Sequence, residues 1–109
     1  MGETGRNMEK VSAERATHGS MGELRLATGQ HVALRLWEHR AHQEKKATVR
    51  PYETVGYVIS GRAELNIEGH LLTLEPGDSW VVPAGSMHFY TIPESLTAIE
   101  AISPPAETP

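Results

Sequence analysis

The amino-acid sequence predicts an all-β fold, either a sandwich or a closed barrel. Its apolar residues alternate with a period of two, and glycine- and proline-containing turns separate the alternating runs at regular spacing. Helical spacing of apolar residues occurs only over Asn7 to Ala16, where the pattern is short. With 109 residues the chain provides for one such domain, because domains usually contain about 100–150 residues.

The first four predicted strands follow one another from the alternating pattern. One strand is expected at Leu24–Leu26 and a second at Val32–Trp37, in which the Val and Leu side chains share one face and Arg35 occupies the other. The third and fourth strands are expected at Val55–Ile59 and Ala63–Ile67. This half of the chain therefore predicts an extended, turn-linked sheet.

The second half continues the pattern with clearer turns. Glu68-Gly69 is typical of a two-residue turn and predicts a hairpin between Ala63–Ile67 and His70–Leu74. Three further strands are expected, at Trp80–Val82, Met87–Ile92 and Leu96–Ile102.

The two ends of the chain lack this alternation. Residues 1–20 are polar and predict a flexible N-terminal arm, whereas residues 103–109 form a proline-rich tail that cannot complete a strand ladder. The predicted barrel therefore occupies residues 21–102.

Composition narrows the classes of partner and cofactor. Fourteen acidic and ten basic residues give a net charge of -4 without a basic cluster, which argues against a nucleic-acid partner. The chain has no cysteine, so any metal would depend on imidazole and oxygen ligands. No apolar run is long enough to span a membrane and no secretory signal is apparent, so the expected location is the cytoplasm.

The most specific motif lies between Gly77 and His88. Its Gly77, Pro83, Gly85 and His88 fit the pattern G-x5-P-x-G-x2-H, which resembles the second motif of the cupin superfamily. The segment from Tyr52 to Leu65 is similar to the latter half of the first cupin motif. This resemblance covers roughly Leu24 to Ile102 and implies a cupin-type double-stranded β-helix, a jelly-roll barrel, with His88 directed into its interior.

The resemblance extends to the scaffold more than to the metal ligands. Metal-bearing cupins generally present two histidines in an H-x-H pattern, an acidic or glutamine ligand and the histidine of the second motif. In this chain Thr54 occupies the third-ligand position, and Thr48, Arg50 and Tyr52 alternate where the first two histidines would stand. An arginine cannot ligate a cation and would repel one, so the motif predicts a degenerate metal site.

The same positions predict a pocket for a small organic molecule. Strand parity directs several side chains toward one interior, and Arg50 makes an anionic ligand the natural choice. The predicted pocket residues are Arg50, Tyr52, Thr54, His88 and Tyr90. Because an imidazole titrates near neutral pH, His88 could act as a hydrogen-bond donor, an acceptor or a base; no catalytic residue is assigned.

Two alternatives stay open at this stage. In the first, the chain is a metal-dependent enzyme, a dioxygenase, isomerase or lyase, in which His88 holds a divalent metal together with His39 and His42. The competing interpretation of His39 and His42 places both in an exposed loop. In the second, the chain is a non-catalytic binding module. A homodimer is expected under either reading, because a small core leaves apolar strand residues exposed.

Overall fold

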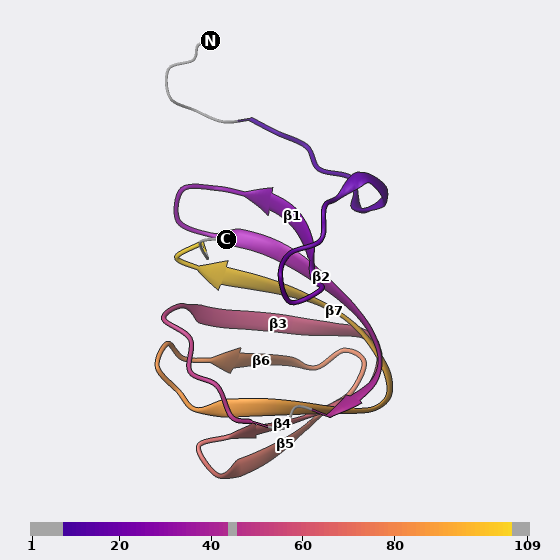
Figure 1. The fold of residues 1–109 in the computed structure, drawn as a ribbon, viewed down its shortest axis with the longest axis vertical. Helices are drawn as coiled ribbons and strands as arrows, with labels where there is room; N and C mark the ends of the chain where they lie inside the picture. The colour runs from indigo at the N-terminus through magenta and orange to yellow at the C-terminus, as the bar shows by residue number, and fades with distance from the viewer. Residues whose placement is uncertain (1–7, 44–45, 106–109) are drawn as a thin grey trace.

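The computed structural model describes residues 8–43 and 46–105, which form a curved barrel of antiparallel β-strands (Figure 1). A short 3-10 helix at Ala13–Arg15 precedes the strands. The strands are β1 Leu24–Thr28, β2 Ala33–Gln43, β3 Glu53–Gly61, β4 Ala63–Ile67, β5 His70–Leu74, β6 Ser79–Val82 and β7 His88–Ser103. The all-β fold predicted from the sequence is therefore confirmed.

Strand β7 organises the sheet. The strand order is β1-β2-β7-β3-β6, and β4 pairs with both β5 and β7. The first residues of β7 pair with β4, and the remainder pairs with β3 on one side while β2 follows it along the other. The two strands predicted at Met87–Ile92 and Leu96–Ile102 are thus a single strand of 16 residues that curves around the barrel.

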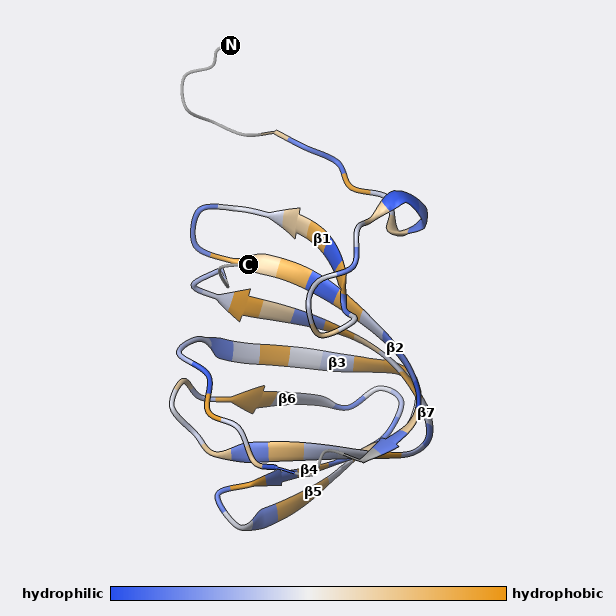
Figure 2. Cartoon of the chain, viewed as in Figure 1, coloured by the Kyte–Doolittle hydropathy of each residue, from blue (hydrophilic) through white to orange (hydrophobic). Residues whose placement is uncertain are grey.

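Side-chain alternation along β3 shows how the barrel separates its two faces. Thr54 and Val58 are buried, whereas Val55, Tyr57 and Ile59 are about half exposed on the outer surface. Figure 2 shows hydrophobic and hydrophilic residues as bands along the strands. The interior core includes Val58, Leu65, Leu74, Trp80, Val82, Ile92, Leu96 and Ala98.

The inner face of β2 is the one that carries the charge. The alternation predicted between Leu34 and Arg35 is present, but Arg35 is only 8% exposed and Leu34 is 39% exposed. Tyr57 on β3 likewise faces outward and is 49% exposed. A period of two identifies two faces without saying which of them is covered.

The predicted hairpin turn is confirmed. Glu68 and Gly69 both have positive φ angles, 48° and 83°, as a tight turn between twisted strands requires. At the other end of the barrel, His18 forms an isolated bridge to Leu24, and the backbone NH of Arg25 donates to the Thr17 carbonyl. The end of the predicted arm is therefore hydrogen-bonded alongside β1. Residues 1–7 and 106–109 lie outside the described part of the chain.

None of the segments described forms a helix with the length and apolar character that a membrane crossing requires.

Replacing Leu65 by alanine tests the position of the core. Leu65 is fully buried, so Leu65→Ala should lower the free energy of unfolding by about 2–5 kcal/mol, through lost burial and the cavity left behind. Urea denaturation of both variants provides the measurement, with Leu71→Ala on the paired strand β5 as the matched control. Leu71 is 61% exposed, and equal losses in the two variants would contradict the assigned face of the hairpin.

Candidate functional site: a cavity inside the barrel

The barrel encloses a cavity of about 300 Å³. This volume lies at the lower end of the range for small-molecule sites. The lining includes every residue predicted for the pocket and both loop-candidate histidines, namely Arg50, Tyr52, Thr54, His88, Tyr90, His39 and His42. Its apolar part comes from Ala63, Leu74, Ile92, Leu96 and Ala98. The structure therefore brings the predicted site residues together in one interior.

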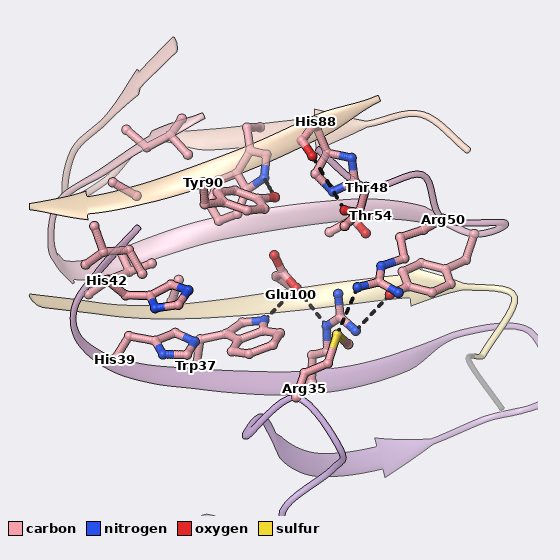
Figure 3. Close-up of a pocket in the computed structure, with 18 residues that line it drawn as sticks. Arg35, Trp37, His39, His42, Thr48, Arg50, Thr54, His88, Tyr90 and Glu100 are labelled. Carbon is pink, nitrogen blue, oxygen red and sulfur yellow. Dashed lines mark hydrogen bonds and ion pairs between the residues drawn. The ribbon is translucent and has the colours of Figure 1, made fainter. Parts of the chain in front are cut away.

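The corner of the second motif positions Arg50 next to His88. Gly85 has a φ angle of 83°, which a side chain would strain, and its NH donates to the Arg50 carbonyl at 2.9 Å. Thr48 and His88 exchange two backbone hydrogen bonds of 2.8 and 2.9 Å. The segment that carries Arg50 is therefore fixed to the start of β7, and Figure 3 shows Thr48, Thr54, Arg50 and His88 at the same end of the cavity.

A glycine on β3, Gly56, leaves the space that the Trp80 indole occupies. Gly56 on β3 is the register partner of Trp80 on β6, and a Cβ atom at Gly56 would lie 2.4 Å from the Trp80 ring. The indole Nε1 then donates to the Tyr90 hydroxyl at 3.2 Å. Gly56 thus allows an aromatic side chain to cross β3 into the interior.

The hydrogen bonding of His88 determines its tautomer. Nδ1 lies 3.0 Å from the Ser86 carbonyl oxygen, which can only accept, so the proton is on Nδ1. In the neutral ring Nε2 is then the acceptor, and it becomes a donor when the imidazole is protonated. The ring is 8% exposed and packs edge-on to Tyr90 with centroids 5.7 Å apart.

Arg50 carries a charge that the described residues leave uncompensated. Its Nη2 donates to the Met21 sulfur at 3.2 Å. A thioether is a weak acceptor, and within residues 8–43 and 46–105 no carboxylate forms an ion pair with Arg50. Met21 belongs to the turn before β1, so this turn and the segment held by Gly85 meet at the Arg50 guanidinium.

A second guanidinium, that of Arg35, was not predicted to line the pocket, and its charge is neutralised by a carboxylate. Arg35 Nε donates to Glu100 Oε1 at 2.7 Å, and its Nη1 donates to the Tyr52 hydroxyl at 3.3 Å. The Trp37 indole NH donates to the same Glu100 oxygen at 2.7 Å. Burial lowers the pKa of Arg35, but the Glu100 carboxylate and the hydrogen bond to Tyr52 outweigh burial, so the pKa lies above its ordinary value.

Side chains on the inner face of β2 stack into what we call the β2 ladder: Arg35, Trp37, His39 and His42. Trp37 and His39 are stacked with centroids 4.9 Å apart, and His39 and His42 follow at 6.0 Å. The Arg35 guanidinium lies over the Trp37 ring at 5.2 Å. The register of β2 and β7 shifts between Arg40 and His42, where two steps along β2 oppose three along β7, and His42 lines the cavity with His39.

The location of the two histidines corrects one expectation. His39 and His42 were expected either in an exposed loop or folded toward a metal; both lie within β2 and line the cavity. An imidazole holds a metal in the plane of its ring, whereas these two rings are stacked with an interplanar angle of 15°. Their lone pairs therefore do not converge on one ion.

The residues present do not fit a divalent metal. Among the described residues no three histidine, aspartate or glutamate side chains form a group that could hold an ion. Where the family pattern has ligands, the cavity has the Thr48 and Thr54 hydroxyls and the Arg50 guanidinium beside His88. The cation that this end of the cavity contains is the arginine side chain itself.

Comparison with protein families shows which family the chain belongs to. The model of the family described as cupin domain matches residues 22–100. The chain belongs to the cupin family. Comparison with curated protein sequences gives no significant match.

Several solved structures share the fold across nearly the whole chain. An RmlC-like cupin from Shewanella frigidimarina has a TM-score of 0.80 at 20% identity, covering 94% of this chain and 96% of its own. KdgF from Halomonas sp. has a TM-score of 0.73 at 22% identity, with 93% and 96% covered. BH2720 from Bacillus halodurans has a TM-score of 0.75 at 16% identity, with 96% and 87% covered. Identities this low establish the fold alone, so the function of this cupin domain must be argued from its own cavity.

Removing the Glu100 carboxylate tests the buried ion pair. Glu100→Ala leaves the Arg35 guanidinium buried without a counter-charge, which should lower the free energy of unfolding by about 3–5 kcal/mol. Thermal and urea denaturation measure the loss, and Glu94→Ala is the control, because Glu94 is an exposed carboxylate on the same strand. A loss at Glu100 no larger than that at Glu94 would refute the pairing.

Proposed function

We propose that this cupin domain binds a small organic acid inside its barrel and does so without a metal ion. The observation that carries the proposal is the Arg50 guanidinium, which lines the cavity and has no carboxylate partner within the described residues. A buried or half-buried charge of this kind favours a ligand of opposite charge.

The charges of the cavity indicate the charge of the ligand. Arg35 and Glu100 form a close pair and cancel one another. Arg50 then adds one permanent positive charge to the lining of the cavity. A monoanion therefore balances the interior, whereas a dianion or a cation leaves it charged.

The groups around Arg50 match the oxygen atoms of a carboxylate. A guanidinium presents a planar fork of NH donors that can hold both carboxylate oxygens. The Thr48 hydroxyl lies at the same end of the cavity, and so does the His88 ring (Figure 3).

An Arg50→Gln substitution tests this proposal. It removes the charge but keeps a polar side chain of similar length, so the affinity for a small carboxylate such as benzoate should fall by at least about tenfold. Isothermal titration calorimetry measures the dissociation constant with and without EDTA, and the chelator should have no effect. Arg62→Gln is the control, because Arg62 is exposed outside the cavity.

Two outcomes of this titration count against the proposal. One is unchanged benzoate affinity in Arg50→Gln, which would remove the assigned role of the guanidinium. The other is binding that disappears in EDTA and returns with a divalent metal, which would make the metal-dependent alternative correct.

The outer face of the sheet supports a second proposal, a homodimer. Leu34, Ala101, Val55 and Val81 are consecutive register partners across β2, β7, β3 and β6. Three of them are 39–48% exposed, and Tyr57 in the neighbouring row is 49% exposed. A contiguous apolar row of this kind marks an association surface, and two copies can cover it by two-fold symmetry.

Placing a charge in the middle of this row tests the dimer. Wild-type protein at micromolar concentration should have twice the chain mass by light scattering, and Val55→Glu should reduce the mass to that of a monomer, because the interface would bury an unpaired carboxylate. Leu71→Glu, at a more exposed position on β5 away from the row, should stay dimeric. A monomeric wild-type protein would rule out the proposal.

A further inference from the structure

The aromatic side chains of the β2 ladder present the edges of their rings to the cavity. Arg35 lies over one side of the Trp37 indole and His39 stacks on it along the strand, so the two broad faces of the indole are occupied. Figure 3 shows Trp37 between these two side chains, with Glu100 above the ladder and Tyr90 across the cavity. A ligand in the cavity therefore meets the rims of the Trp37 and His39 rings.

Ring edges and ring faces differ in charge. The edge of an aromatic ring carries a positive partial charge and its face a negative one, so two rings attract when the edge of one meets the face of the other. A planar conjugated group lying across the ladder would place its face on the Trp37 and His39 rims. A saturated ring of the same size has no such face and would gain only from apolar burial.

The two ends of the cavity orient such a ligand. Arg50 lies at one end with Thr48 and His88, and the indole and imidazole rims lie toward the other (Figure 3). Ile92, Leu96 and Ala98 add apolar surface but no charge. A carboxylate at Arg50 thus leaves the body of the ligand beside the ladder.

We propose that the ligand of this cavity is a planar conjugated carboxylic acid, bound with its carboxylate on Arg50 and its ring face on the rims of Trp37 and His39. This inference rests on the proposed binding of an organic acid and names the class of acid. The size of the cavity limits the ligand to about a single ring with a short conjugated arm.

A matched pair of acids tests the inference. Benzoate and cyclohexanecarboxylate carry the same charge and a six-membered ring, but only benzoate has a π face. Calorimetric titration should give a dissociation constant for benzoate about threefold to tenfold lower than for cyclohexanecarboxylate. Burial of apolar surface alone would make cyclohexanecarboxylate bind as tightly as benzoate or more tightly. Tighter binding of benzoate therefore indicates a contact with its π face.

The variants locate the effect. Trp37→Leu should remove the preference for benzoate, whereas Phe89→Leu, which changes an aromatic residue outside the cavity, should retain it. If Trp37→Leu fails to fold, the ratio measured on the wild-type protein decides the question. Equal or tighter binding of cyclohexanecarboxylate, with both acids lost in Arg50→Gln, would overturn this inference and leave the proposed function standing. Binding of neither acid would overturn both.

Discussion

The ion pair between Arg35 and Glu100 determines how the interior of this barrel is built. The two residues are direct register partners on β2 and β7, and their side chains meet at 2.7 Å with little solvent exposure. A lone guanidinium at this depth would carry a large desolvation cost, which the carboxylate offsets. Because both charges face inward together, the pair determines which faces of β2 and β7, the two longest strands, point into the barrel. The same Glu100 oxygen also accepts a hydrogen bond from Trp37 and so holds the indole in place.

Neutralising Arg35 leaves Arg50 to set the charge of the cavity. In the family pattern this end of the barrel holds metal ligands, whereas here Thr48, Arg50 and Thr54 surround His88. A metal site gathers anionic or neutral ligands around a cation. Under the proposed function, the Arg50 guanidinium is the cation and the bound acid supplies the anion. On this view the scaffold is retained while the polarity of the interaction between protein and ligand is reversed.

The sequence predicted the barrel and part of the cavity lining, and the reasons why it did not predict the rest are physical. Turn residues act locally, so the hairpin at Glu68-Gly69 could be predicted from neighbouring residues. The inward direction of His88 was instead implied by the resemblance of Gly77–His88 to the second cupin motif. Arg35 and Glu100 are 65 positions apart, and nothing local to either residue indicates that they are partners. His39 and His42 both line the cavity across a register shift, which strict alternation along the sequence does not reveal.

The contact between Arg50 and Met21 bears on how an anion could enter. A carboxylate from the chain itself at the position of Met21 would satisfy the guanidinium so well that a ligand would have to break an ion pair to bind. A thioether sulfur covers the guanidinium with apolar atoms and accepts only a weak hydrogen bond, so exchanging it for a ligand carboxylate improves the interaction. The turn that carries Met21 is itself held by Glu23, whose carboxylate accepts from the Met21 backbone NH at 3.0 Å. Under the proposed function, a ligand carboxylate would replace only the Met21 sulfur at Arg50, because the turn itself is held by the separate hydrogen bond to Glu23.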